Sequence, residues 1–219
     1  MVDYVTGTPG MLDFANGLIR AMDDKYSAYI LFDKNDPAQA EEFRTITRKV
    51  METIKEGTTR EGRDANGAKT APPFAGRNPD DPAFVKALHM PFGDGDTAVF
   101  ASGEHAGQPR SEVNKEFAGH WFVKVSTRTN LLEEGRIIDP HRTPVKASDL
   151  YAGNMVRVRL WLQAYKADRG GMGVTARLVS MVVTDPGAPL FDRADSDPFA
   201  GFDLPDENGA NDPFSGMGV

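Results

Sequence analysis

The segment Met155–Lys166, MVRVRLWLQAYK, constrains the fold of this chain more than any other. Successive side chains of a β-strand point to opposite faces, so the segment separates into two sets. The apolar set, suited to a core, is Val156, Val158, Leu160, Leu162 and Ala164. The other set mixes cations with large rings and contains Met155, Arg157, Arg159, Trp161, Gln163 and Tyr165. The pattern predicts a long strand with one face in a core and the other in solvent.

The surrounding half of the chain has the same β character. Residues 118–127, 133–140 and 174–185 are rich in Val, Ile, Thr and aromatic residues and are separated by turn residues. Tyr26–Phe32 and Thr97–Ala101 predict two further strands. With 219 residues and 40% apolar content, the chain can bury one sizeable core. We therefore expect one mainly β (α+β) domain over residues 1–191, with one or two helices.

Three segments before this β-rich half have different patterns. Residues 37–55 place apolar side chains at three- and four-residue spacing after a proline, which predicts an amphipathic helix. Residues 57–82 are mostly Gly, Pro, Asn and charged residues, and we expect a long flexible loop there. Residues 1–24 show no clear pattern, although 11–22 are compatible with a short helix.

Charge is distributed very unevenly along the chain. The net charge is −7, but residues 192–219 hold seven acids against the single base Arg193, which leaves −1 for residues 1–191. Residues 116–180 contain ten Lys or Arg and six acids. The tail, 192–219, has no apolar periodicity and is expected to be disordered. It repeats Asp-Pro-Phe, and this repeat favours partner docking through Asp197, Phe199, Asp212 and Phe214.

The second face of Met155–Lys166 has the composition of a single-strand nucleic-acid surface. Cations follow phosphates, and flat rings stack on bases. The residues that we assign to DNA binding are Arg157, Arg159, Trp161, Tyr165, Phe122, Lys124, Arg128 and Arg177. The competing interpretation is ordinary cross-strand packing on an exposed sheet. Trp121 shares a face with Val123 and Val125, so it is assigned to the core.

Other function classes find little support in the sequence. The chain has no cysteine, and its four histidines have no paired spacing of the kind that binds metals. No nucleophile motif or distinctive acid pair indicates catalysis. We therefore expect a non-enzymatic protein without cofactor or metal. No segment has the composition of a signal peptide or a membrane helix, which predicts a cytoplasmic protein with no membrane partner.

Several short motifs together resemble the bacteriophage single-stranded-DNA-binding proteins of the OB-fold type that carry an acidic C-terminal tail. They are Asp139-Pro140, the run from Asp149 to Val158, Tyr165, Gly171, the run from Gly173 to Leu178, and Pro91–Asp96. The resemblance implies an OB-like five-stranded antiparallel barrel and binding of single-stranded DNA without strong sequence preference. It also implies a tail that recruits replication or recombination proteins, and location in the bacterial host cytoplasm for a phage-encoded chain.

Two points remain open at the level of sequence. Related tails often end on an aromatic residue, whereas this one ends Gly216-Met217-Gly218-Val219, so either the last residues or the Asp-Pro-Phe repeats make the partner contact. The helix over residues 37–55 is compatible both with packing on the barrel and with homo-oligomer assembly. The alternative function is a structural or adaptor module whose acidic tail keeps it soluble.

Overall fold

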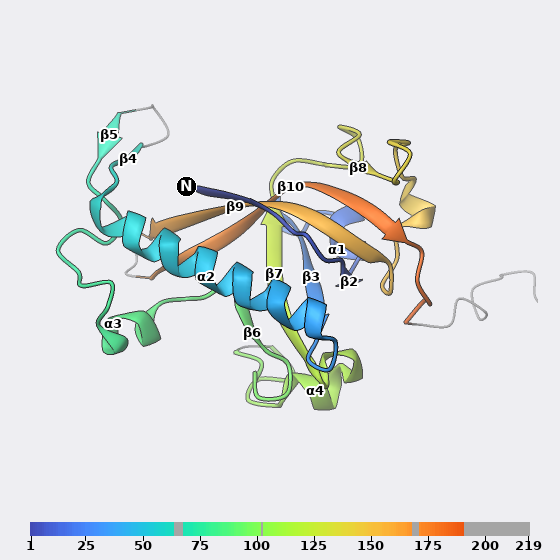
Figure 1. Cartoon of the computed structure of the whole chain (residues 1–219), viewed down its shortest axis with the longest axis horizontal. Helices are drawn as coiled ribbons and strands as arrows, with labels where there is room; N and C mark the ends of the chain where they lie inside the picture. The colour runs from blue at the N-terminus through green and yellow to red at the C-terminus, as the bar shows by residue number, and fades with distance from the viewer. Residues whose placement is uncertain (64–67, 102, 168–170, 191–219) are drawn as a thin grey trace, which may run out of the picture.

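The computed structural model describes residues 1–63, 68–101, 103–167 and 171–190. Five strands close into a barrel (Figure 1): β2 (Gly10–Asp13), β3 (Tyr26–Asp33), β7 (His120–Thr127), β10 (Met172–Asp185) and β9 (Met155–Lys166). β9 pairs with both β10 and β2, and this double pairing closes the ring. The expected mainly β, OB-like barrel is confirmed. One detail differs from the expectation, because β7 and β10 pair in parallel while the other barrel pairs are antiparallel.

Shorter elements surround the barrel. β1 (Val2–Val5) pairs with β9, β6 (Phe92–Asp94) with β7, and β8 (Ile137–Ile138) with β10. β4 (Gly62–Arg63) and β5 (Lys69–Thr70) form a separate two-stranded sheet. The helices are α1 (Asn16–Ile19), α2 (Pro37–Thr59), α3 (Pro82–Ala87), α4 (Arg110–Val113) and the 3-10 turns η1 (Lys115–Phe117) and η2 (Ala147–Asp149). None of the helices in the described ranges is long and apolar enough to cross a membrane.

The alternation of β9 is realised as expected. Its apolar set points into the barrel, where Val156, Leu160 and Leu162 are completely buried. The other barrel strands contribute the same kind of interior residue, among them Ile30, Val125 and Leu178. A second, smaller cluster lies outside the barrel wall and consists of Leu31, Phe117 and Phe122. The outer face of the barrel therefore has its own partly apolar covering near η1.

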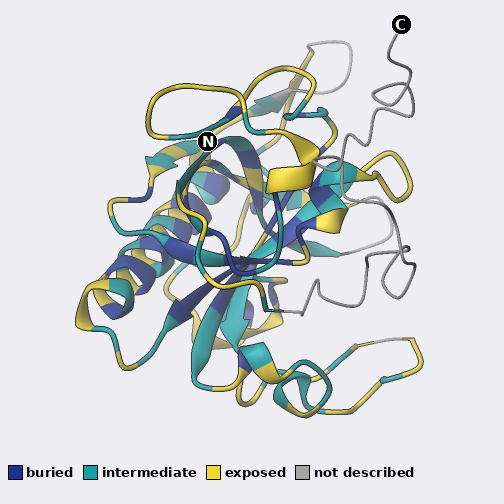
Figure 2. Cartoon of the chain, turned by 90° about the vertical axis from the view of Figure 1, so that its right-hand side faces the viewer, coloured by how far each residue is buried: buried dark blue, intermediate teal, exposed yellow. Residues whose placement is uncertain are grey.

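α2 packs across the barrel and seals one side of the core (Figures 1 and 2). Asp36 caps its N-terminus by accepting hydrogen bonds from the N–H groups of Ala38 and Gln39, and Pro37 occupies the first turn. The buried stripe of the helix contains Ile46, Val50 and Ile54. The helix is confirmed and extends four residues beyond the predicted end, to Thr59.

The packing of two rings supports the assignment of Trp121 to the core side of β7. The Phe43 ring of α2 stacks on the Trp121 ring at 5.0 Å between centroids and 4° between planes. Trp121 is half-buried and packs against the main core. α2 thus packs on the barrel, which is one of the two alternatives that the sequence left open for this helix.

Two local expectations were wrong, and the one for the start of the chain was incomplete. Residues 57–82 are not simply a flexible loop, because Phe74 is 1% exposed and its ring packs on Phe84 and against Gly57. The start of the chain forms β1 and β2, and the only helix within 11–22 is the single turn α1. Residues 97–101 do not form the expected strand. Val99 and Phe100 form isolated bridges, and the nearby strand is β6, a few residues earlier. In each case tertiary packing overrides a weak local pattern.

A buried carboxylate connects α2 to the N-terminal strands. Glu42 is 7% exposed, and its Oε2 accepts hydrogen bonds from the N–H groups of Gly7 and Thr8 at 2.9 and 2.8 Å. Its Oε1 accepts from the Tyr4 hydroxyl. Burial, reinforced by the hydrogen bond to Glu42, raises the pKa of Tyr4 well above its usual value. Glu42 therefore fixes the turn between β1 and β2.

We expect Glu42→Ala to lower the free energy of unfolding by about 1–3 kcal/mol, because two backbone donors lose their acceptor in a partly buried site. Urea unfolding followed by circular dichroism measures this loss. The control is Glu41→Ala, on the next residue, since the Glu41 side chain is 60% exposed and makes only surface ion pairs with Arg44 and Arg48. Equal losses in the two variants would contradict the anchoring role of Glu42.

Candidate nucleic-acid interface

The outer face of the β9–β10 hairpin carries a ring and a cation in direct contact. Trp161 of β9 is opposite Arg177 of β10 in the strand register. The Arg177 guanidinium carbon lies 5.4 Å from the centroid of the Trp161 ring, a cation–π arrangement. Arg177 is exposed and takes part in no ion pair with the described residues, so its charge is available to an anion.

The two other arginines of β9 are exposed as expected but already have partners. Arg159 forms a double hydrogen bond with the Asp3 carboxylate of β1, one bond from Nε at 3.0 Å and a second from the terminal nitrogen. This contact lowers the pKa of Asp3. Arg157 donates from Nε to the carbonyl oxygen of Thr6 at 2.8 Å and keeps its charge unpaired within the described ranges. Arg159 is therefore the weaker candidate for phosphate contact.

Two further predicted residues lie at the edges of this face. Tyr165 is half-buried at the end of the hairpin, opposite Gly173. Arg128 is exposed just beyond the end of β7. Both are on the barrel surface, although neither forms a ring–cation pair with a described residue of the kind seen at Trp161.

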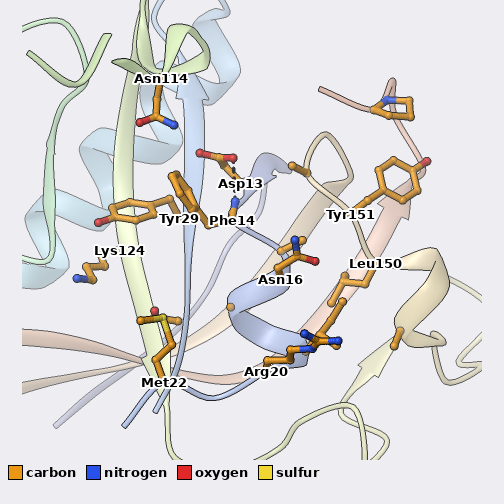
Figure 3. A pocket seen from close by; sticks show the side chains of 17 residues that line it. Asp13, Phe14, Asn16, Arg20, Met22, Tyr29, Asn114, Lys124, Leu150 and Tyr151 are labelled. Carbon is orange, nitrogen blue, oxygen red and sulfur yellow. Dashed lines mark hydrogen bonds between the residues drawn. The ribbon is translucent and has the colours of Figure 1, made fainter. Parts of the chain in front are cut away.

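A groove of about 720 Å³ lies on the same outer surface, over β2, β3 and β7 (Figure 3). One wall comes from the segment after β2, with Phe14 and Arg20, and the opposite wall from the turn that contains Leu150 and Tyr151. Tyr29 of β3 and Lys124 of β7 lie along its floor, and Pro189 borders it after β10. The lining is mostly apolar and aromatic, with cations at its margin.

Tyr29 is bordered by two cations. The Lys124 ammonium lies 5.8 Å and the Arg110 guanidinium carbon 5.3 Å from the centroid of its ring. Arg110 also lies over the rings of Phe100, Phe117 and Phe122. Neither cation forms an ion pair with any residue of the described ranges. The ring and its cations therefore repeat, at β3 and β7, the chemistry of Trp161 and Arg177.

Phe122 requires a correction. It lies on the outer face of β7 beside Lys124, as the alternation predicts, but its ring is only 8% exposed. The rings of Tyr29 and Phe117 pack edge-on against it at 5.6 and 5.4 Å. The reason is that η1 folds back over this part of the barrel. Phe122 is thus covered in this structure and supports Tyr29, with no free ring face for a base.

Phe14 is an exposed ring in a strained backbone conformation. Its φ is 54°, in the left-handed region that non-glycine residues seldom adopt, and it is 43% exposed. Its backbone N–H donates to Asp13 Oδ1 at 2.8 Å, and its ring centroid lies 5.5 Å from that of Tyr29. Strain that presents an apolar ring to solvent beside a groove is typical of a binding site.

Asp13 lies at the base of the groove and is only 1% exposed. Its Oδ1 accepts the Phe14 N–H, whereas its Oδ2 has no hydrogen-bond partner among the described residues. Burial raises the pKa of Asp13 to about 7, and the nearby Glu116 carboxyl adds to the effect. A buried, unsatisfied oxygen of this kind is rare in folded proteins and calls for a functional explanation.

The groove and the hairpin face are linked by a row of register partners on the outer side of the barrel. In the register, Ser27 of β3 is opposite Ser126 of β7, Ser126 is beside Arg177, and Arg177 is opposite Trp161. Neighbouring strands lie about 4.8 Å apart, so about 14 Å of sheet separates the rim of the groove from Trp161. The closed barrel thus places two ring–cation pairs, Tyr29 with Lys124 and Trp161 with Arg177, on its outer face.

Sequence reasoning predicted that Lys124, Trp161 and Arg177 face outward but missed the groove. The alternation of Tyr26–Phe32 contains a signal for Tyr29, because Ile30 and Phe32 belong to the core and Tyr29 must then point outward. Phe14 and Arg110 have no comparable signal, since their positions depend on a strained turn and on a short helix. The tail residues Asp197, Phe199, Asp212 and Phe214 lie outside the described residues.

The described residues contain no group of three or more His, Asp or Glu side chains placed to hold a metal ion. The arrangement can instead bind a flexible polyanion whose flat groups stack on its rings. Binding of this type requires rings and cations on a surface and needs no catalytic group.

Comparison with known proteins gives a consistent result. The solved structure of the single-stranded DNA-binding protein from bacteriophage Enc34 is similar with a TM-score of 0.54 and 16% identity, over 86% of this chain and 87% of that chain. The same protein in complex with ssDNA gives 0.54 and 15%, over 84% and 87%. Gp2.5, a single-stranded DNA binding protein encoded by bacteriophage T7, gives 0.50 and 14%, over 95% and 97%.

At these identities, the structural likeness establishes the fold. The sequence has no match among curated proteins. A family model described as Enterobacter phage Enc34, ssDNA-binding protein, matches residues 14–212, which include all the barrel strands except β2. The chain belongs to this family of phage single-stranded-DNA-binding proteins.

Proposed function

We propose that this protein binds single-stranded DNA along the outer wall of its barrel, from the groove over β2, β3 and β7 to Trp161 on β9. The observation that carries the proposal is the presence of two ring–cation pairs on the outer face of the barrel, joined through the register of β7 and β10. Family membership supports it, as does the similar fold of the Enc34 protein solved with ssDNA.

Two contributions to the binding free energy, base stacking and phosphate contact, would combine, and both tolerate any base sequence. Stacking of a base on Tyr29, Phe14 or Trp161 is worth about 1–3 kcal/mol for each ring. Phosphate contacts by Lys124, Arg110 and Arg177 release counterions, so affinity falls as salt rises. Every base has a flat face and every nucleotide a phosphate, which is why the surface accepts most sequences. The protein acts by binding and carries out no bond chemistry.

We also propose that the acidic tail competes with DNA for this surface. The described chain ends beside the groove, since Pro189 lines it and the Leu190 N–H donates to the carbonyl oxygen of Ala152 at 3.0 Å. The tail that follows carries seven acids. A tether that starts at the rim gives these acids a high effective concentration over the cations. DNA would displace them and free Phe199 and Phe214 for replication or recombination proteins in the host cytoplasm.

Substitutions on the hairpin test the DNA surface. Trp161→Ala is expected to weaken binding of fluorescein-labelled oligo-dT by about 5- to 150-fold, the equivalent of losing 1–3 kcal/mol of stacking. Arg177→Ala should lower the slope of log affinity against log salt by about one unit. Fluorescence anisotropy at several salt concentrations measures both.

Two arginines provide matched controls for this test. Arg159→Ala should have a smaller effect than Arg177→Ala, because Asp3 already neutralises Arg159. Arg44→Ala, on the exposed side of α2, should leave affinity unchanged. If Trp161→Ala and Arg177→Ala also leave affinity unchanged, the surface does not bind DNA, and the adaptor alternative is favoured.

Removal of residues 192–219 tests the tail. We expect tighter binding of oligo-dT at low salt and a difference that shrinks as salt screens the acids. A full-length variant with the seven tail acids changed to Asn or Gln should behave like the truncation, which separates charge from length. Unchanged or weaker binding by both variants would refute competition.

The recruiting role has a separate readout. Phe199→Ala combined with Phe214→Ala leaves the tail charge intact, so affinity for oligo-dT should not change. The same variant should lose replication or recombination proteins that the full-length protein retains on an affinity column. Retention of those proteins by the double variant would show that the Asp-Pro-Phe repeats are not the docking elements.

A further inference from the structure

Three residues on neighbouring strands form a row across the floor of the groove. Asp13 of β2 is directly opposite Tyr29 of β3, and Tyr29 is directly opposite Lys124 of β7. All three side chains lie on the outer face of the barrel and line the same groove (Figure 3). With strands about 4.8 Å apart, the row spans about 10 Å. Its order is an oxygen acceptor, a flat ring and a cation.

The dimensions and order of this row match one nucleotide. A base stacked on the Tyr29 ring has its phosphate on one side, within reach of the exposed Lys124 ammonium. Its hydrogen-bonding edge then faces β2 and the Asp13 carboxyl. Because Asp13 Oδ2 has no donor among the described residues, a donor on the base would satisfy it.

We propose that Asp13, Tyr29 and Lys124 form a base-reading subsite in which Asp13 accepts a hydrogen bond from an exocyclic amino group. The subsite therefore favours cytosine, adenine or guanine over thymine. This inference rests on the proposed DNA-binding function and adds a preference to a surface that is otherwise tolerant of sequence.

The preference follows from the edges of the bases. The cytosine amino group has one hydrogen directed away from N3 and toward C5–H, so a carboxylate can accept it without meeting another acceptor. Uracil and thymine offer only N3–H, which is flanked by two carbonyl oxygens that repel a carboxylate. Acceptance of the cytosine N4 amino group by Asp or Glu is an established mode of base recognition.

Among the described neighbours of Asp13, Glu116 of η1 is the one that competes with a ligand for this acceptor, since the two carboxyls can share a hydrogen bond when one of them is protonated. Glu116 also accepts from Asn114 Nδ2 at 3.1 Å, and two ionised carboxylates cannot donate to each other, which leaves the Asp13 oxygen to a donor on the ligand. Lys124 and Arg110 are directed to the Tyr29 ring. Asp13 is 1% exposed yet lines the groove next to the 43% exposed Phe14, so the proposal requires a local movement at this edge of the groove when a base binds.

The experiment compares the full-length protein on labelled oligo-dC and oligo-dU of equal length, two pyrimidines without the thymine methyl group. The measurement is made at a pH of about 8.5, above the Asp13 pKa of about 7, so that the carboxylate can only accept. We expect oligo-dC to bind more tightly by at least about fivefold, the lower end of the range for one base contact. A ratio near one in the wild-type protein would overturn the proposal.

Variants of Asp13 test whether the preference for dC over dU comes from the row of Asp13, Tyr29 and Lys124. Asp13→Leu should bring the ratio of dC to dU affinity close to one while oligo-dU still binds. The substitution removes the unsatisfied Oδ2 but also the Oδ1 that accepts the Phe14 N–H, so circular dichroism checks that the variant folds. Asp13→Asn should also reduce the ratio, because an amide offers a donor as well as an acceptor and can pair with either pyrimidine. It serves as the second test if the leucine variant does not fold.

Tyr29→Leu is the control, because losing the ring weakens binding to both oligonucleotides. A wild-type preference that persists unchanged in both Asp13 variants would assign base reading to another residue and overturn the proposal. Failure of the wild-type protein to bind either oligonucleotide would instead refute the proposed function. The two failures are therefore distinguishable.

Discussion

The structure depends on β9 pairing with three strands. Its full length pairs with β10, while its other edge pairs with β2 at Met155 and Val156 and with β1 further along. These pairings satisfy its backbone polar groups on both sides and close the barrel. Closure fixes the alternation, because a shift of one residue would turn Arg157 and Trp161 into the core. The binding surface and the hydrophobic core are thus set by the same register.

The candidate binding surface also differs from the rest of the molecule in that its cations lack acidic partners among the described residues. On α2, cations such as Arg44 and Lys49 are matched by acids on the same helix. On the barrel wall, Lys124, Arg110 and Arg177 lie over rings and have no acidic partner in the described part of the chain. A guanidinium on a ring is partly desolvated and held in place, which lowers the entropic cost of binding a phosphate. In the sequence, the seven acids of residues 192–219 carry the charge of opposite sign to these cations.

Much of this arrangement could be predicted from the sequence because it rests on strong periodic patterns. The strand Met155–Lys166, the helix beginning at Pro37 and the outward direction of Arg177 follow from two-residue and four-residue spacing. The groove could not be predicted in this way. It depends on the left-handed Phe14, on Arg110 in a four-residue helix and on η1 folding over Phe122. Phe74 was missed for the same reason, since a single ring among polar residues gives no periodicity, yet it fills the space beside Gly57.

The closing pair between β2 and β9 also determines when the protein can fold. Gly10 and Val156 are neighbours in the barrel, although most of the domain lies between them in the sequence. Contacts this distant form late and slowly, because a long loop must be closed before they stabilise anything. During synthesis β2, β3 and β7 therefore keep an open edge until β9 and β10 emerge, and such edges favour aggregation. The acidic tail is synthesised after the last barrel strand, so the barrel can complete its ring before the tail's counter-charge emerges.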